Sequence, residues 1–314
     1  MINKGLNKDL SIQKWLFLKA LKTPHMKPTF SKIIQGCMGW GAWGKHLNTN
    51  EMVDLMHHSM ACGLTTFDHA DIYGDYTTEA DFGKAFSTSG IARESVQIIS
   101  KCGIQYVGET RNNEIKHYQY DADYIVWSAE KSIKELQCGY LDLLLLHRPS
   151  PLMHPDEVAK ASEKLLSEGK IKAFGVSNFT PSQTDLIRSK SPVTVNQIEF
   201  SITAHQALFD GSLDHMLQHH IIPMAWSPLG SVFKEKNDQT YRIHDVLREL
   251  SDTYNASLEQ LLLAWILKHP AGIHPVIGTA SKERIKSASG AASIDLSEVD
   301  WFKLLVASQG HKVP

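Results

Sequence analysis

The chain has 314 residues, of which 42% are hydrophobic and 21% are charged, and its formal net charge is −2 at pH 7. This composition is typical of a soluble globular protein with a sizeable core, and the length suits one large α/β barrel. The near-neutral charge argues against a nucleic-acid-binding surface as the main function. The apolar run 15–18 is far shorter than the roughly 20 residues of a membrane span. No signal-peptide cleavage site follows it, so we expect a cytoplasmic protein without membrane contacts.

Residues 1–27 are interpreted as an N-terminal extension, and residues 28–314 as a single domain. The extension either reflects an upstream start codon or forms an amphipathic helix that docks on the domain or on a partner. The four cysteines have no CxxC spacing, so free buried thiols in a reducing compartment are expected. The adjacent histidine pairs 57–58 and 219–220 do not share a helix face as an i, i+4 pair would, and no metal site is predicted.

Apolar, β-branched runs alternate with segments of helical period along the chain. The predicted strands are 32–38, 65–68, 96–101, 141–147, 173–177, 195–199, 222–227 and 275–278. The predicted helices between them are 50–62, 78–87, 122–136, 156–168, 180–189, 205–219 and 258–269. Eight alternating units predict a parallel sheet closed into a (β/α)8 TIM barrel.

A doubly wound open sheet is the alternative fold. Against it, the glycine-rich run 36–41 after the first strand lacks the GxGxxG spacing of a dinucleotide fingerprint. Two stretches, 103–121 and 230–241, are predicted to be long loops after the third and seventh strands. In a barrel both would lie on the active-site face, where loops shape the substrate pocket.

Four titratable residues follow apolar runs: Asp68, Tyr73, Lys101 and His147. Each alone is more commonly a surface or core residue, but together at successive strand ends they predict a proton-transfer site. A tyrosine has a pKa of about 10, and a nearby ammonium lowers that value. We therefore predict Tyr73 as general acid, Lys101 as the group that tunes it, and Asp68 as the partner of Lys101. His147 would hydrogen-bond and orient the substrate oxygen.

These four residues, in this order, resemble the catalytic tetrad of the aldo-keto reductases. The resemblance covers roughly residues 28–308, and the residues around Asp68 and His147 resemble a bacterial oxidoreductase branch. It implies NADPH (NADP+) as cofactor, bound in a groove without a Rossmann domain. The amides and hydroxyl of Ser177, Asn178 and Gln197 would hold the nicotinamide carboxamide, and Trp226 would stack on the ring. The other cofactor contacts implied are Gly39, Trp40, Ser227, Leu229, Gly278, Thr279 and Arg284.

The segment 277–284 follows the last strand and opens a helix, where barrel phosphate sites form. In the family comparison Arg284 matches the arginine that grips the 2′-phosphate, a role suited to its fork geometry. The best-known members carry Lys-Ser where this chain has Gly278-Thr279. Lys282 would be a compensating cation, although it occupies a different position.

The sequence thus predicts an NADPH-dependent reductase of aldehydes and ketones. The alternatives are an NADPH-binding sensor or regulatory subunit with slow turnover, and a Schiff-base lyase or aldolase that uses Lys101 as nucleophile. The expected partner is a small-molecule carbonyl substrate, with no nucleic acid and no membrane, and the expected assembly is a monomer or a weak homo-oligomer.

Overall fold

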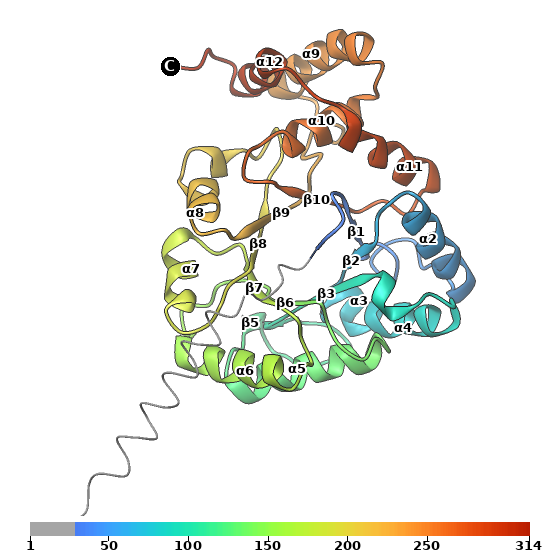
Figure 1. The fold of residues 1–314 in the computed structure, drawn as a ribbon, viewed down its shortest axis with the longest axis vertical. Helices are drawn as coiled ribbons and strands as arrows, with labels where there is room; N and C mark the ends of the chain where they lie inside the picture. The colour runs from blue at the N-terminus through green and yellow to red at the C-terminus, as the bar shows by residue number, and fades with distance from the viewer. Residues whose placement is uncertain (1–28) are drawn as a thin grey trace, which may run out of the picture.

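A closed barrel of parallel strands forms the centre of the protein in the computed structural model, which describes residues 29–314 (Figure 1). The predicted extension 1–27 lies outside the described residues. The strand order around the barrel is β1-β10-β9-β8-β7-β6-β3-β2. The strands are β1 (Ile34–Gly36), β2 (Thr66–Asp68), β3 (Gln97–Cys102), β6 (Leu143–Leu146), β7 (Phe174–Ser177), β8 (Val195–Glu199), β9 (Ile222–Trp226) and β10 (His274–Ile277). Each of the eight predicted strands is confirmed, and the open-sheet alternative is wrong.

Helices cover the outside of the barrel, one or two after each strand. They are α2 (Thr49–Ala61), α4 (Thr78–Thr88), α5 (Ala122–Glu135), α6 (Pro155–Ser167), α7 (Pro181–Arg188), α8 (Ser212–Gln218), α10 (Leu258–Leu267) and α11 (Lys282–Gly290). Local sequence explains their starts. Asn48 and Glu51 form a capping box before α2, and Thr180 and Gln183 form one before α7, where Pro181 occupies the first turn.

One helix prediction and one loop prediction need correction. The predicted helix 205–219 is divided into η2 (Gln206–Leu208) and α8, because Gly211 between them has φ +82° and interrupts the helix. The predicted loop 230–241 is shorter than expected, since α9 (Asp238–Tyr254) begins inside it, capped by Asn237. Helices α9 and α12 (Glu298–Gln309) pack against each other at the end of the molecule farthest from α5 and α6 (Figure 1).

The hydrophobic core has an inner and an outer part. Inside the barrel, Ile34, Ile99, Leu143 and Leu145 belong to one buried cluster, which Phe30 extends before the first strand. Larger clusters fill the space between the strands and the surrounding helices. Apolar layers therefore fill the barrel interior, and the polar site described below lies at the carboxyl ends of the strands.

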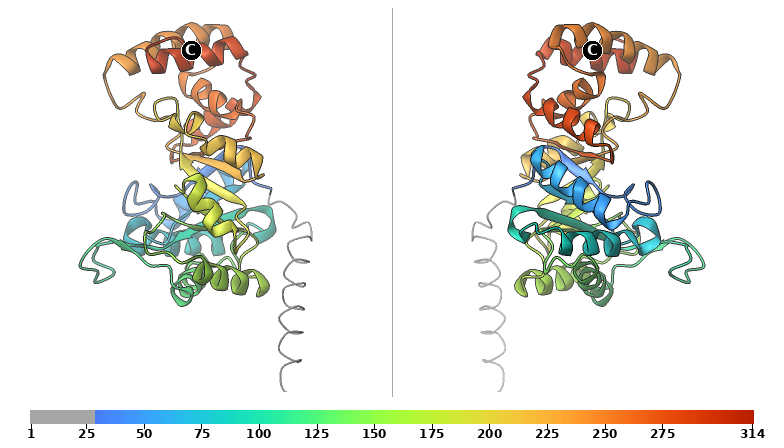
Figure 2. Two further views of the ribbon diagram at one scale, coloured as in Figure 1. Left: turned by 90° about the vertical axis from the view of Figure 1, so that its left-hand side faces the viewer. Right: turned by 90° about the vertical axis from the view of Figure 1, so that its right-hand side faces the viewer.

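Residues 103–121, here called the β4–β5 segment, contain a short hairpin that the sequence did not predict. Strand β4 (Ile104–Gln105) pairs antiparallel with β5 (His117–Tyr118). Figure 2 shows this teal-green segment extending from the body on the same side as the blue segment that follows β1. The segment was expected to be a loop because two-residue strands leave no periodicity in the sequence.

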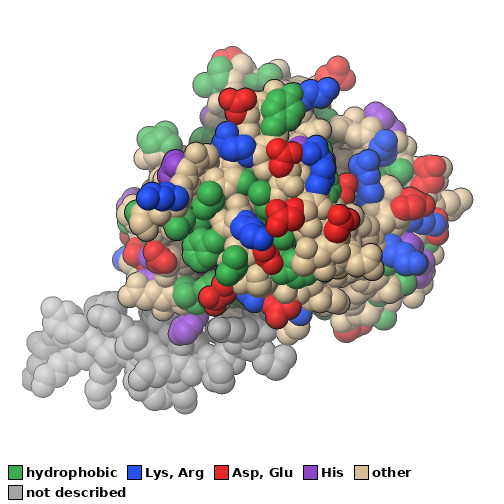
Figure 3. All heavy atoms as spheres, turned by 90° about the horizontal axis from the view of Figure 1, so that it is seen from above, with side chains coloured by type: hydrophobic (Ala, Val, Ile, Leu, Met, Phe, Trp, Pro, Cys, Tyr) green, Lys and Arg blue, Asp and Glu red, His purple; other side chains and the backbone are tan. Residues whose placement is uncertain are grey.

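The molecular surface carries charges of both signs. On the face that holds α9 and α12, lysine and arginine side chains alternate with aspartate and glutamate (Figure 3). In the part of the chain that the structure describes, the helices are all too short or too polar to span a bilayer.

Candidate active site

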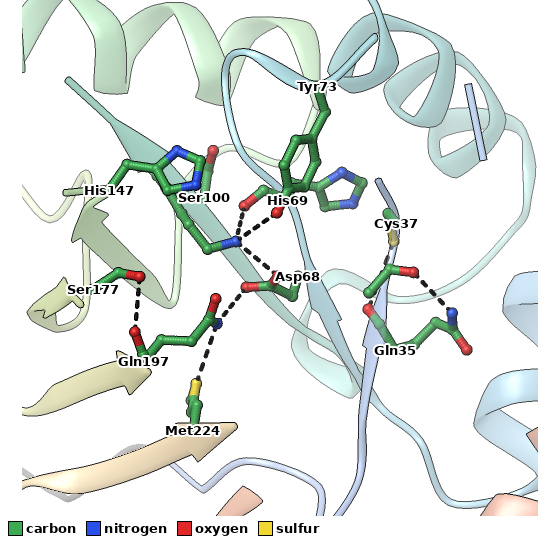
Figure 4. A network of polar contacts seen from close by, with 12 residues as sticks. Gln35, Cys37, Asp68, His69, Tyr73, Ser100, His147, Ser177, Gln197 and Met224 are labelled. Carbon is green, nitrogen blue, oxygen red and sulfur yellow. Dashed lines mark hydrogen bonds and ion pairs between the residues drawn. The ribbon is translucent and has the colours of Figure 1, made fainter. Parts of the chain in front are cut away.

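The ammonium group of Lys101 is the centre of the polar site, where it contacts Asp68, His69 and Tyr73, which are labelled in Figure 4. Its Nζ atom lies 2.7 Å from Asp68 Oδ2, 2.8 Å from the carbonyl oxygen of His69 and 3.1 Å from the hydroxyl of Tyr73. Asp68 ends β2, Lys101 lies near the end of β3, and Tyr73 begins the short turn α3 (Tyr73–Tyr76). The barrel therefore brings three of the four predicted catalytic residues into direct contact.

The Lys101–Asp68 ion pair is almost fully enclosed, with 1% and 3% of the two side chains exposed. Gln197 Nε2 donates to the second carboxylate oxygen of Asp68 at 2.9 Å, so both oxygens have partners. Burial lowers the pKa of Lys101, but Asp68 and then Tyr73 together raise it more strongly, and the result lies above the ordinary value. Lys101 is thus a permanent ammonium in the neutral pH range.

Tyr73 is held as a phenol. Burial raises its pKa, and although Lys101 acts in the opposite direction, the balance lies above the ordinary value. Lys101 thus lowers the pKa as the sequence led us to expect, but desolvation of the phenolate outweighs the neighbouring ammonium. A neutral phenol beside a fixed cation is suited to donate a proton and to carry the resulting negative charge.

His147, just after β6, completes the group from the other side. Its ring lies edge-on to Tyr73, with ring centroids 6.2 Å apart. Burial, followed by the charges of Lys101 and Arg148, lowers the pKa of His147 well below its usual value. The imidazole is therefore neutral, and one ring nitrogen is a donor while the other is an acceptor. Among the described residues its buried Nδ1 finds no hydrogen-bond partner.

Two aromatic residues that were not predicted from the sequence extend the site: Trp43 lies beside Tyr73, and Tyr106 lies beside Trp43. The Trp43 ring centroid lies 6.4 Å from that of Tyr73 and 5.2 Å from that of Tyr106. Trp43 follows β1 and Tyr106 belongs to the β4–β5 segment, so both come from loops at the carboxyl ends of strands. An aromatic residue in a glycine-rich loop at that place is the signal that could have identified Trp43.

The predicted carboxamide-binding residues form one connected group. Asn178 Oδ1 accepts from the indole nitrogen of Trp226 at 2.8 Å, and its Nδ2 donates to Ser177 Oγ at 2.8 Å. Ser177 Oγ donates in turn to the carbonyl oxygen of Gln197 at 2.8 Å. The side-chain amide of Gln197 is turned toward Asp68, so its present contacts are with the ion pair. The guanidinium of Arg148 lies 5.5 Å from the centroid of Trp226.

Trp40 does not fit the predicted cofactor-binding role. Its side chain is fully buried in the outer core, where it packs against Phe67 and Phe82 with centroid distances of 6.2 and 5.9 Å. The expectation is corrected for the side chain, because an enclosed indole cannot contact a ligand in a surface groove. The neighbouring Gly39 does lie near another predicted contact, since a Cβ built on it would be 3.7 Å from the carbonyl oxygen of Gly278.

The end of β10 offers an anion site. The Ser281 hydroxyl caps α11, and nothing lies within 4 Å of a Cβ built on Gly278, so the approach to the backbone is open. Arg284 is exposed in the first turn of α11, and no described residue forms an ion pair with it. Lys282 instead pairs with Asp54 on α2, which argues against it as the compensating cation. These features fit a phosphate group held at a helix N-terminus.

The remaining predicted contacts line the loops at these strand ends. Thr279 Oγ1 accepts from the backbone nitrogen of Ser281 at 3.1 Å. Ser227 follows β9 with φ +53°, and Leu229 is half-buried against the outer core.

Three potential metal ligands come together elsewhere, between α7 and α8. Asp185, His215 and His219 place ligand atoms within 4.8 Å of one another. The two histidines are four residues apart on one helix, and they were not predicted as ligands from the sequence. Asp185 Oδ1 already lies 3.0 Å from Arg188 and 2.9 Å from His215 Nε2, so the contacts are explained by an ion pair within α7 and a hydrogen bond from that carboxylate to α8.

A TIM barrel whose strand ends combine a phenol, an ammonium, a carboxylate and a neutral imidazole has the fold of many barrel enzymes and the groups that proton transfer requires. Comparison with known proteins narrows this class. The profile of the Aldo/keto reductase family matches residues 32–304. Oxidoreductase YdhF of Escherichia coli is 40% identical over 290 residues, which cover 91% of this chain and 96% of that protein.

Two further matches agree. The 6-dehydroglucose reductase of Agrobacterium fabrum is 37% identical over 81% of this chain and 86% of that protein. A solved aldo/keto reductase from Klebsiella pneumoniae, in complex with NADP and acetate, has a TM-score of 0.71 and 26% identity, and the match covers 88% of this chain and 90% of that one. The chain therefore belongs to the aldo/keto reductase family, and it is an oxidoreductase with bacterial relatives.

Proposed function

We propose that the protein reduces aldehydes or ketones to alcohols with NADPH, and that Tyr73 is the general acid. The single observation that carries the proposal is the contact set of Lys101, which touches Asp68 and Tyr73 at 2.7 and 3.1 Å inside the barrel mouth. When bound, NADPH supplies the hydride that reaches the carbonyl carbon. The chain must supply the proton for the carbonyl oxygen and must orient the substrate.

Tyr73 supplies that proton from its hydroxyl. As the carbonyl oxygen gains negative charge, the O–H bond of Tyr73 breaks and a new O–H bond forms on the product. The phenolate left behind is stabilised by Lys101, whose own charge Asp68 maintains, and it regains a proton from solvent. A neutral His147 can donate one hydrogen bond to the same substrate oxygen and fix its direction.

The residues present fit the proposed cofactor. The linked side chains of Ser177, Asn178 and Trp226 provide donors, acceptors and an aromatic face beside His147, which suits a nicotinamide carboxamide and its ring. At the other end, exposed Arg284 at the α11 N-terminus suits a 2′-phosphate and favours NADPH over NADH. The Klebsiella pneumoniae relative crystallised with NADP supports the same assignment.

The Schiff-base alternative is disfavoured by the state of Lys101. A nucleophilic lysine needs a neutral amine. Burial with no nearby anion, or a position beside a second cation, would lower the lysine pKa and provide one. Here burial does lower the pKa of Lys101, but Asp68 and Tyr73 together hold it above its ordinary value. The ammonium is therefore engaged in hydrogen bonds and is unsuited to attack a carbonyl.

The test compares wild type with Tyr73→Phe for NADPH oxidation against aldehydes, α-dicarbonyls, quinones and a sugar with an aldehyde at C6. The last is included because a relative is named 6-dehydroglucose reductase. We expect kcat to fall by about 10² to 10⁴ while the NADPH dissociation constant changes little. Tyr241→Phe, an exposed tyrosine on α9, is the matched control and should retain activity. A wild type that binds NADPH but reduces nothing would favour the sensor alternative.

A further inference from the structure

The backbone directly after Tyr73 adopts a conformation that L-amino acids avoid. Gly74, Asp75 and Tyr76 have φ values of +61°, +56° and +65°, so three consecutive residues are left-handed. Two of them carry side chains, which in this region crowd the backbone. Such strain persists only where surrounding contacts determine the conformation, and here it lies next to the proposed acid.

The carboxylate of Asp75 supplies the first set of contacts. Its Oδ2 atom accepts from the backbone nitrogens of Glu109 and Thr110 at 2.8 and 3.0 Å, and from Thr110 Oγ1 at 3.2 Å. Gly108 lies so close that a Cβ built on it would collide with the Asp75 carboxylate. Glycine at 108 is therefore what permits the β4–β5 segment to close on Asp75.

Tyr76 supplies the second set, again with the β4–β5 segment. Its hydroxyl donates to the carbonyl oxygen of Ile104 at 3.2 Å and accepts from the backbone nitrogen of Tyr106 at 2.8 Å. The guanidinium of Arg111 lies 3.6 Å from the Tyr76 ring centroid. Both non-glycine residues of the strained turn are thus fixed by one segment, which also contributes Tyr106 to the wall beside Trp43.

We propose that Asp75 is a positioning residue for Tyr73, acting by fastening the β4–β5 segment to the strained turn. We call its contacts with residues 108–110 the Asp75 clasp. The inference rests on the proposed function, because it assigns Tyr73 as the group being positioned. The clasp joins the segment that carries Tyr106 to the loop that carries the acid, so the position of the phenol depends on where that segment lies. Near-attack geometry is sensitive to displacements of about 1 Å, which can cost about 10²-fold in rate.

Three variants separate the effect of losing the clasp contacts from the effect of changing the backbone strain. Asp75→Gly tolerates the left-handed conformation but removes the carboxylate. Asp75→Asn is the matched control, because asparagine also tolerates this conformation and keeps an oxygen that can accept from Glu109 and Thr110. Gly108→Ala leaves Asp75 intact and obstructs the clasp from the opposite side. Position 108 has no positive φ, so alanine there adds no backbone strain.

We expect Asp75→Gly and Gly108→Ala each to lower kcat by a factor of about 10 to 100, with an unchanged NADPH dissociation constant. Asp75→Asn should remain within about threefold of wild type, since its amide oxygen can replace the lost acceptor. The double variant Asp75→Gly/Gly108→Ala should be no slower than the worse single variant, because both changes disable the same contact. Hydrogen exchange at Glu109 and Thr110 should accelerate in both single variants.

Two results would overturn the proposal. If the variants raise KM and leave kcat unchanged, the clasp shapes the pocket without placing Tyr73. If hydrogen exchange at residues 109 and 110 is unaffected, the clasp does not hold the segment. Failure of the proposed function has a different signature, since wild type would then bind NADPH and reduce none of the carbonyls, whereas the exchange measurement needs no turnover.

Discussion

Two groups of buried carboxyls lie on opposite sides of the wall formed by β2 and β3. Inside the barrel, Asp68 contacts Lys101 at 2.7 Å. Outside it, Asp71 and Glu79 lie between β3 and the helices α4 and α5, with serine hydroxyls as their nearest partners: Ser128 donates to Asp71 at 3.1 Å and Ser100 to Glu79 at 2.5 Å. Successive residues of a strand point to opposite faces, which is why neighbours Ser100 and Lys101 serve different groups.

The two groups differ in charge. Burial raises the pKa of Asp71 to about 7, with Arg111 and Ser128 acting in the opposite direction. Burial raises the pKa of Glu79 to about 8, opposed by Ser100 and reinforced by Asp71. Lys101, in contrast, is held as a cation by its carboxylate partner in spite of its burial.

The comparison separates the effect of burial on the charge of a carboxyl from the effect of a hydrogen-bonded cation. A carboxyl enclosed with hydroxyls takes up a proton near neutral pH, whereas one enclosed with an ammonium forms an ion pair. Only the second arrangement gives Tyr73 a fixed positive neighbour. The barrel-interior side of the wall is therefore distinguished by Lys101 rather than by its acidic residue.

The largest effect is expected from Lys101→Met, which leaves Asp68 buried without a cation. Breaking a buried pair costs about 3–5 kcal/mol of unfolding free energy, and loss of the charge beside Tyr73 should lower kcat by about 10² or more. Urea unfolding and NADPH oxidation measure the two effects. The double variant Asp68→Asn/Lys101→Met removes both charges and should regain part of the stability, but none of the activity. A double variant less stable than the single one would contradict this account of the inner site.

The sequence predicted the barrel because each strand is a compact apolar run and most of the helices begin at a capping side chain. Those are local signals, and the eight strands were placed within a few residues. The helix predicted at 205–219 is divided at Gly211. The positive φ of this one residue does not show in the sequence pattern, which is helical on both sides of it. The hairpin of Ile104–Gln105 with His117–Tyr118 is stabilised by pairing between distant residues, which periodicity does not reveal.

The four proposed catalytic residues were predictable because each follows its own strand, and parallel strands end on the same face. The net pKa shifts and the burial of individual side chains were not predictable in the same way. The raised pKa of Tyr73 depends on how completely the side chain is enclosed, and the burial of Trp40 depends on Phe82 from a neighbouring helix. Asp75 was missed because its role depends on residues more than thirty positions later in the chain.

Glu79→Gln tests the outer group. The folded-state pKa of Glu79 is raised from 4.5 to about 8, so the protonated carboxyl contributes stability that is fully present below pH 4.5 and is lost as pH rises toward 8. Glutamine is neutral throughout. We expect the free energy of unfolding of the variant, relative to that of wild type, to increase by a few kcal/mol between about pH 5 and pH 9, as measured by urea unfolding. Exposed Glu163→Gln is the control for the chemical change itself. A pH-independent Glu79→Gln difference would mean that the carboxylate is accommodated in the folded state.

A smaller effect of the same sign is expected for Asp71→Asn, because here cations face the carboxyl. Burial raises the pKa of Asp71 from 3.8 to about 7, while Arg111 from the β4–β5 segment and Lys131 from α5 both lower it. Wild type should lose stability relative to the variant as pH rises from about 4 to 7, by less than in the Glu79 case. Arg111→Met sharpens the test, since it removes the stronger of these two cations. When the Asp71→Asn comparison is repeated in that background, the midpoint of its pH-dependent stability difference should move upward, as measured by unfolding at closely spaced pH values. An unchanged midpoint would show that Arg111 is too well solvated to act on Asp71. A nearby cation would then not be enough to keep a carboxylate charged inside this fold, and the direct hydrogen bond that Lys101 makes to its partner would be required.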